Sequence, residues 1–389
     1  MEPSPPARSH ARFVRSCTPP PRSRPGSAGR ASRYSSWAYY NLNGKHMNHK
    51  SFLPALVIVL SIVLANCSFP SASTPEPTAT QTVSTAPVTP TETPPALSTV
   101  ELGRVENPII LALPPAANSE DQIAAARFIA DQFIQRTGYA VVTIVPDSYE
   151  ALVEAFAAGN AHMALLNPYA YTLAYQRGLV HAAFATLNDG DNLYGAQFIA
   201  TRKGGFKSYV DPLTGENTAD ARTALLQFTD KKPCWTDETS ASGYVIPAGY
   251  LTANNISTRP PAFVEGHPTV VRSLYASGIC DFGGTYIDAR TFPSLESEFP
   301  DLIEQVILVW RIPEIIPYDL FVFSSNMPQG MRNLFSDQIP ALMQTDEGFT
   351  AFETAYTIEA LQPVNDAFYA EFRTYVEASG VDLSGLLDK

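Results

Sequence analysis

The segment Glu238-Thr-Ser-Ala-Ser-Gly-Tyr244 combines hydroxyl side chains and a glycine between a predicted strand and a predicted helix. The first backbone N–H groups of a helix have no partner inside it, and the helix dipole favours negative charge at that end. Serine hydroxyls there add further donors, so the segment could hold a tetrahedral oxyanion without a basic side chain. The alternative is ordinary N-capping by Ser240 or Ser242, which the same residue types favour equally.

Two further strand-to-helix turns carry polar side chains. His267 lies in Val264-Glu-Gly-His-Pro268, and Asn167-Pro-Tyr-Ala-Tyr171 follows another predicted strand. In open α/β sheets, ligands gather beyond the carboxyl ends of strands, so these side chains could reach one ligand. His267 could instead be a surface or capping residue, and the tyrosines could simply pack.

The elements that position these turns alternate between strands and helices. Apolar runs that end at Pro, Gly or Asn predict strands, and apolar residues at helical spacing predict helices. The predicted strands are 109–113, 140–145, 161–166, 232–236, 262–264, 279–282, 306–310 and 320–323, and the predicted helices are 121–137, 148–159, 242–253, 268–277, 330–345 and 364–379. This rhythm predicts an α/β protein with two α/β lobes, a ligand cleft and a hinge.

The chain length and the late return of strands predict a discontinuous first lobe. A chain of 389 residues exceeds what one hydrophobic core usually supports. We predict a first lobe from residues 101–200 and 306–389, and a second lobe from 201–305. The polar, turn-rich segment 204–220 is interpreted as a surface insertion.

Charge is unevenly distributed along the chain, whose formal net charge is −12. Residues 1–46 contain seven Arg and one Lys against one acid, whereas the chain from residue 100 onward contains 17 basic and 35 acidic residues. Such an acidic body lacks the basic surface of a nucleic-acid-binding protein, so nucleic acid is excluded as a partner. The whole chain contains 21 Phe and 18 Tyr, so the protein is not a disordered acidic chain either.

Residues 47–66 have the pattern of an export signal. Lys50 precedes an apolar run of about 14 residues, which is too short to span a bilayer core of roughly 30 Å. The ending Leu64-Ala-Asn-Cys67 resembles a bacterial lipobox, although Asn66 replaces the usual small residue. That resemblance implies lipidation of Cys67 and anchoring at the outer face of a cell membrane. The alternative is a plain signal anchor with an incidental cysteine.

The flanking segments have biased compositions. Residues 1–46 are rich in Arg, Pro and Ser without apolar periodicity, so we interpret them as a spurious extension upstream of a true start at Met47. A disordered cytoplasmic tail is the alternative. Residues 67–100 are dominated by Pro, Thr, Ser and Ala, which predicts an extended linker between the anchor and the folded body.

Several short motifs follow one another in a recognisable order. They are Tyr149-Glu-Ala-Leu-Val-Glu, Gly159-Asn-Ala-His-Met-Ala, Asn167-Pro-Tyr-Ala-Tyr, Tyr194, Ser240-Ala-Ser-Gly-Tyr-Val-Ile-Pro and Gly266-His-Pro. This order resembles the phosphonate/phosphate-type (PhnD-like) substrate-binding proteins of ABC importers. The resemblance implies a type II periplasmic-binding-protein fold that captures a phosphonate, phosphate or phosphite-like oxyanion for an ABC permease. We expect a monomer without a cofactor, a metal or catalytic residues.

The resemblance also assigns ligand-binding roles. In that family a Ser-Thr-Ser run, a histidine and two tyrosines hold the phosphonate, and by position these roles fall on Tyr149, Tyr194, Ser240, Ala241, Ser242 and His267. Ala241 replaces the central Thr, so one hydroxyl donor is lost, which corresponds to roughly ten- to a hundredfold in affinity. Asp288 and Asp319 match the acids that hold a ligand ammonium in some members, which favours a zwitterionic ligand. Each could instead cap a turn or helix.

The pattern of cysteines and histidines favours a structural role over metal binding. Cys234 and Cys280 are the two cysteines of the body, and such a pair in an exported protein predicts a disulfide. No Cys or His spacing resembles a zinc site.

Some sequence features are also compatible with functions other than oxyanion capture for transport. These functions are binding of another small anion such as a sulfonate or organic acid, a sensing role, and a secreted serine hydrolase that uses Ser242 with His267 and Asp281. No Gly-x-Ser-x-Gly elbow surrounds Ser242, which disfavours the hydrolase.

Overall fold

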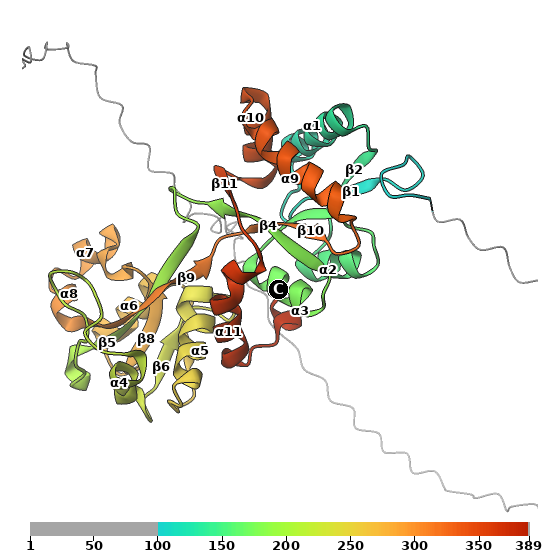
Figure 1. The fold of residues 1–389 in the computed structure, drawn as a ribbon. Helices are drawn as coiled ribbons and strands as arrows, with labels where there is room; N and C mark the ends of the chain where they lie inside the picture. The colour runs from blue at the N-terminus through green and yellow to red at the C-terminus, as the bar shows by residue number, and fades with distance from the viewer. Residues whose placement is uncertain (1–99, 388–389) are drawn as a thin grey trace, which may run out of the picture. The chain divides into compact units, whose positions relative to one another are not determined.

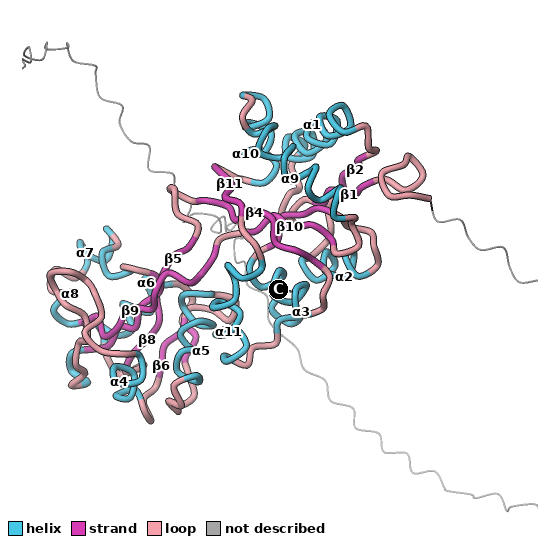
Figure 2. Tube along the Cα trace, in the orientation of Figure 1, coloured by secondary structure: helices cyan, strands magenta, loops and turns pink. Residues whose placement is uncertain are grey.

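The computed structural model describes residues 100–387, whose backbone forms two mixed β-sheets flanked by helices (Figures 1 and 2). The predicted α/β class with two lobes is confirmed. The predicted extension 1–46, the signal peptide 47–66, Cys67 and nearly all of the linker 67–100 lie outside the described residues. Within the described part, no helix is long and apolar enough to cross a membrane.

The first lobe is built on a six-stranded sheet with the order β11-β4-β10-β3-β1-β2. β1 pairs in parallel with β2 and β3, whereas β10 runs antiparallel to β3 and β4, and β11 antiparallel to β4. Its strands are β1 (Ile109–Ala112), β2 (Val141–Ile144), β3 (Met163–Leu166), β4 (Val180–Leu187), β10 (Leu320–Ser324) and β11 (Ala360–Pro363). Every residue of β3 is buried, as expected for a strand covered on both faces of the sheet.

The helices of the first lobe begin and end at local sequence signals. They are α1 (Glu120–Thr137), α2 (Tyr149–Ala157), α3 (Pro168–Gln176), α9 (Gln329–Met343) and α10 (Asp346–Tyr356). Ser119 and Gln122 form a capping box at the start of α1, and Gly138 ends it at φ 75°. The Asn167 side chain accepts the N–H groups of Tyr169 and Ala170, which fixes the start of α3 directly after β3.

The second lobe is built on a five-stranded sheet with the order β7-β6-β8-β5-β9. β6 pairs in parallel with β7 and β8, and β5 lies antiparallel between β8 and β9. Its strands are β5 (Leu193–Thr201), β6 (Pro233–Trp235), β7 (Ala262–Phe263), β8 (Phe282–Tyr286) and β9 (Val306–Pro317). Its helical segments are η1 (Arg202–Gly204), α4 (Ala221–Leu225), η2 (Leu226–Phe228), η3 (Ala241–Val245), α5 (Ile246–Ala253), α6 (His267–Ala276), η4 (Ala289–Thr291), α7 (Pro293–Glu298) and α8 (Leu302–Gln305).

The second sheet extends beyond the predicted range 201–305, because β5 and β9 both belong to it. The chain therefore passes between the lobes after β4 and again at Tyr318–Asp319, between β9 and β10. The reason is a long-range pairing: β5 aligns with β9 from Leu193–Pro317 to Thr201–Val306. Apolar periodicity identifies a strand but does not show which sheet it joins.

The C-terminal segment contacts both lobes. The predicted helix 364–379 starts later, at Ala370, because η5 (Asp366–Tyr369) comes before α11 (Ala370–Ser379). α11 packs on α5 of the second lobe, beside which it lies in Figure 1, and α12 (Leu383–Leu387) packs on α2 and α3 of the first lobe. One continuous hydrophobic core joins these helices to the inner faces of both sheets.

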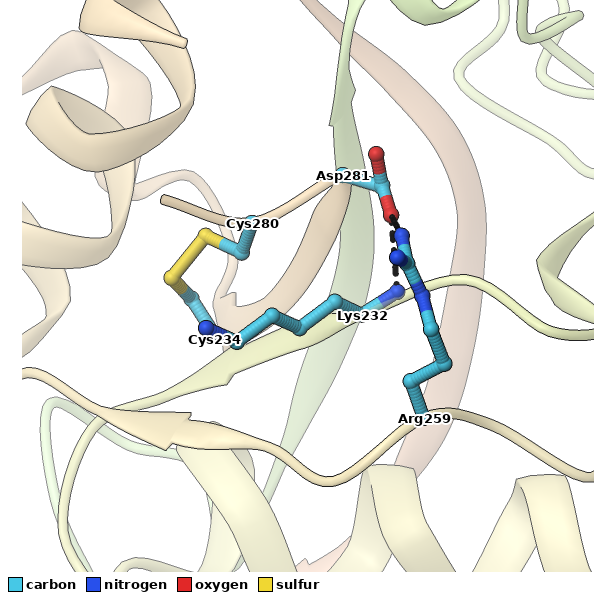
Figure 3. The surroundings of a disulfide bond; sticks show 5 residues. All are labelled: Lys232, Cys234, Arg259, Cys280 and Asp281. Carbon is cyan, nitrogen blue, oxygen red and sulfur yellow. Dashed lines mark hydrogen bonds and ion pairs between the residues drawn. A yellow bond between two sulfur atoms is a disulfide. The ribbon is translucent and has the colours of Figure 1, made fainter. Parts of the chain in front are cut away.

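A disulfide joins Cys234 of β6 to Cys280, whose Cα atoms lie 5.6 Å apart (Figure 3). Cys280 precedes β8, because that strand begins at Phe282 and not at residue 279 as predicted. Next to the disulfide, the Asp281 carboxylate accepts the Lys232 N–H at 2.8 Å and pairs with Arg259 at 2.6 Å. The disulfide links the connection before β8 to β6, a neighbouring strand of the same sheet.

Candidate ligand-binding site

The turn between β6 and α5 presents the start of a helix. Ser240 is extended, and its Oγ accepts the Gly243 N–H at 3.0 Å, so Ser240 caps the segment. Ala241 and Ser242 follow at the first turn, where their N–H groups have no preceding helical carbonyl. A Cβ on Gly243 would lie 2.1 Å from the Thr236 Oγ1, so only glycine lets this turn pack against the end of β6.

His267 begins α6 and is neutral. Its Nδ1 accepts the Tyr286 N–H at 3.3 Å, which leaves the proton on Nε2, where it can be donated to a ligand. Burial lowers the pKa of His267 to about 4, although the carboxylate of Asp237 opposes this. At neutral pH the side chain therefore contributes a hydrogen-bond donor without a net charge.

Two adjacent hollows contain most of the predicted ligand-binding residues. The serine hollow, of about 540 Å³, is lined by Ser242, His267 and Tyr286 among others. The tyrosine hollow, of about 490 Å³, is lined by residues of both lobes that include Tyr149, Asn167, Tyr169, Thr239, Ala241, Asp319, Leu386 and Leu387. Tyr194 and Tyr318 line both hollows, and their ring centroids lie 5.1 Å apart. Ser240 lines neither hollow. It caps the helical segment, which is the alternative role that the sequence predicts for it.

Tyrosine hydroxyls surround the tyrosine hollow. Burial raises the pKa of Tyr149 and of Tyr194, which keeps both phenols protonated and able to donate. The Tyr169 hydroxyl is buried without a hydrogen-bond partner among the described residues. The Tyr171 hydroxyl, by contrast, donates to Asp366 at 2.6 Å, so Tyr171 has a structural role. Tyr169 lines the hollow and Tyr171 does not.

Asp319 places one carboxylate in the tyrosine hollow. No described residue donates a hydrogen bond to that carboxylate, although the Asp319 carbonyl oxygen accepts from the backbone N–H and the side chain of Thr186. Burial raises the pKa of Asp319 to about 7. The group can therefore carry a proton at neutral pH, and it can either donate to an oxyanion or accept from one that is itself protonated.

Asp288 is occupied elsewhere and lines neither hollow. Its carboxylate caps η4, pairs with Arg290 at 2.6 Å and accepts from the Gln197 side chain at 2.8 Å. Burial raises its pKa, but these partners outweigh burial and lower it. The expectation that Asp288 faces a ligand ammonium is corrected to the capping role, because an arginine two residues away takes the carboxylate.

The serine hollow also contains charges that the sequence reasoning did not assign. Arg311, Glu314 and Asp191 line it, and the buried Nε of Arg311 has no partner among the described residues. Arg311 and Tyr318 were not predicted as site residues, because their orientation depends on the pairing of β9 with β5.

The geometry does not support a Ser-His-Asp triad. His267 bonds to Tyr286 at the end of β8, whereas Asp281 precedes the same strand and is held by Lys232 and Arg259 (Figure 3). Among the residues that the structure describes, no Asp therefore supports the Nδ1 of His267, which is itself an acceptor. Among residues 100–387, no group of three His, Cys, Asp or Glu residues could hold a metal ion.

Comparison with known proteins points to transport proteins. A family model described as ABC transporter, phosphonate, periplasmic substrate-binding protein matches residues 111–369. The Phosphate-import protein PhnD of Mycolicibacterium smegmatis is 25% identical over 293 residues, which cover 70% of this chain and 86% of that protein. The matched family segment contains the candidate residues from Tyr149 to Asp319 and leaves out α11 and α12.

The chain is also similar to solved structures. A Xanthomonas citri protein bound to ATP has a TM-score of 0.48 and 14% identity, covering 70% of this chain and 95% of that one. PhnD1 from Prochlorococcus marinus, in complex with methylphosphonate, has a TM-score of 0.41 and 12% identity, covering 69% of this chain and 97% of that one.

Proposed function

The chain belongs to the periplasmic substrate-binding proteins of phosphonate ABC transporters, and we propose that it captures a phosphonate, phosphate or phosphite-like oxyanion in the two hollows. The lobes close on the ligand, which is then delivered to the permease subunits without chemical change. The protein acts as a monomer and needs no cofactor. We expect size-exclusion chromatography with light scattering to give the mass of one chain with and without ligand.

One observation carries the proposal: uncharged donors from separate elements meet where the two hollows adjoin. Ala241 and Ser242 lie at the start of the helical segment that leads into α5, and His267 lies at the start of α6. Tyr194 of β5 lines both hollows beside them. Helix-end N–H groups, hydroxyls and a neutral imidazole can replace the hydration of an oxyanion without a cation.

Titration calorimetry and thermal-shift assays test this proposal with phosphate, phosphite, methylphosphonate, 2-aminoethylphosphonate and methanesulfonate. A ligand at a hundred times its Kd should stabilise the fold by about 2.7 kcal/mol. The Ser242→Ala variant should bind roughly ten- to a hundredfold more weakly, because a hydrogen bond to a charged group is lost. Ser273→Ala is the matched control, because Ser273 is a buried serine of α6 that lines neither hollow.

The outcomes separate the ligand classes. Binding of a phosphorus oxyanion that weakens in Ser242→Ala supports the proposal. Binding of methanesulfonate alone would instead indicate a sulfonate-binding protein. No heat and no thermal shift with any of the anions would contradict capture of an oxyanion.

We further propose that the protein is tethered to the outer face of a cell membrane through a lipid on Cys67. The apolar run after Met47 and the Pro/Thr-rich linker support this. Metabolic labelling with a palmitate analogue should mark the wild type and not Cys67→Ser, which should be released from membranes. Equal labelling of both would contradict the anchor.

A further inference from the structure

The tyrosine hollow is closed on one side by the last described helix. Leu386 and Leu387 of α12 line it together with Tyr149, Ala241 and Asp319. Leu387 is only 6% exposed and belongs to the core that joins the two lobes. This helix lies beyond the segment 111–369 that matches the family model, so the leucine pair is a wall that the family match does not include.

Contacts with both lobes fix this wall in place. On α11, the ring of Tyr375 stacks on that of Tyr250 of α5, with centroids 3.8 Å apart. Gly249 permits this approach, because a Cβ there would lie 2.0 Å from the Tyr375 carbonyl oxygen. Glu377 accepts from the Gln176 side chain of α3 at 2.9 Å, and α12 itself packs on α2 and α3. The leucines are therefore held in register with the hollow.

The side chains that line the hollow differ in their chemistry. Tyr149, Tyr169 and Tyr194 carry hydroxyl donors, whereas the side chains of Leu386 and Leu387 offer none. Asp319 is the only acid among the described residues that line this hollow, and Asp288 is held by Arg290. Asp191 and Glu314 line the adjoining serine hollow, so among the described residues a ligand ammonium in the tyrosine hollow itself would meet one carboxylate only.

We propose that Leu386 and Leu387 are specificity-determining residues whose side chains contact an uncharged alkyl substituent of the bound oxyanion. This inference rests on the proposed function, because it takes the oxyanion to be held by Ser242 and its neighbours. The site thereby favours short alkylphosphonates over aminoalkyl phosphonates of the same length. Each methylene buried against the leucines strengthens binding about fourfold, since its transfer from water is favourable.

Titration calorimetry tests whether the two leucines contact the alkyl substituent. The four ligands are phosphate, methylphosphonate, propylphosphonate and 2-aminoethylphosphonate. The last two have tails of equal length, one apolar and one ending in an ammonium. Propylphosphonate has two more methylenes than methylphosphonate and should bind about fifteenfold more tightly. It should also bind more tightly than 2-aminoethylphosphonate. In Leu386→Ala/Leu387→Ala the gain from the propyl tail should be lost, while phosphate affinity is unchanged. Leu383→Ala is the matched control, because Leu383 lies on α12 but lines a separate hollow.

Four results would overturn the inference. Tighter binding of 2-aminoethylphosphonate than of propylphosphonate would show that Asp319 holds a cation. Equal weakening of phosphate and propylphosphonate in the double variant would show a purely structural role. If circular dichroism shows that the double variant does not fold, Leu386→Phe takes its place. This variant should weaken propylphosphonate binding and leave phosphate binding unchanged. An unchanged propylphosphonate affinity would show that Leu386 does not contact the alkyl substituent. Absence of binding by every oxyanion would overturn the proposed function itself, and the wall with it.

Discussion

Replacing Asp319 by asparagine should change how the stability of the protein depends on pH. Burial raises the pKa of Asp319 to about 7, whereas an aspartate in an unfolded chain titrates near 4. Between about pH 4 and pH 7 the folded protein keeps a proton that the unfolded chain has lost. The free energy of unfolding therefore falls as the pH rises through this window, and the penalty is fully present above it.

The magnitude follows from the difference between the two pKa values. Each pH unit corresponds to about 1.4 kcal/mol, so about three units give at most about 4 kcal/mol. Asp319 lines a hollow that admits water, which reduces the penalty, so we expect about 1–4 kcal/mol. Asp319→Asn cannot ionise and should be more stable than the wild type by this amount at pH 8, with a difference near zero at pH 4.

Urea unfolding followed by circular dichroism at pH 4.5 and pH 8 measures this difference. Asp281→Asn is the control of opposite sign. Burial raises the pKa of Asp281, but the Lys232 N–H and the Arg259 guanidinium outweigh burial and lower it, so that variant should lose stability at pH 8. If Asp319→Asn kept the pH dependence of the wild type, or were less stable at pH 8, the carboxylate would have a stabilising partner and the reasoning would be refuted.

Three further predictions concern the same site and its support. Gly243→Ala should destabilise the fold by about 1–3 kcal/mol and abolish ligand binding, because its Cβ would overlap the Thr236 Oγ1; thermal unfolding and calorimetry check this. Cys234→Ser/Cys280→Ser should lose about 2–4 kcal/mol in urea unfolding, because the disulfide closes a chain separation of 46 residues in the unfolded state. His267→Ala should weaken oxyanion binding roughly ten- to a hundredfold by calorimetry. That loss should be equal at pH 5.5 and pH 8, because burial keeps the pKa of His267 near 4; a larger loss at pH 5.5 would show a charged imidazole.

Local signals determine what the sequence could predict of the fold. The helix predicted at 121–137 is α1 (Glu120–Thr137), because the capping residue Ser119 and the left-handed Gly138 lie next to its ends. The sheet to which a strand belongs is a different matter. β5 and β9 are ordinary apolar strands, and only their mutual pairing across the chain places them in the second lobe. The predicted boundaries near 200 and 306 were therefore displaced, although the two-lobed plan was correct.

The same difference between local signals and long-range packing decides which residues of the candidate site could be predicted. Ser242 and His267 stand directly at strand-to-helix turns, where the sequence itself marks a helix start, and both line the serine hollow. Asp288 was misassigned, although Arg290 two residues later was a visible competitor for its carboxylate. The leucines of α12 could not be predicted, because their place at the tyrosine hollow depends on how α11 and α12 pack.

The charge of the body gives a last test of how the oxyanion is held. From residue 100 onward the chain has 35 acidic and 17 basic residues, so its long-range field repels an anion. If uncharged donors hold the ligand, salt should screen this repulsion and speed association. The Debye length falls from about 30 Å at 0.01 M to about 8 Å at 0.15 M, so the association rate measured by stopped flow should rise between these concentrations. A rate that fell with added salt would instead show that a cation steers the ligand. Arg311, which lines the serine hollow, would then be the residue to replace first.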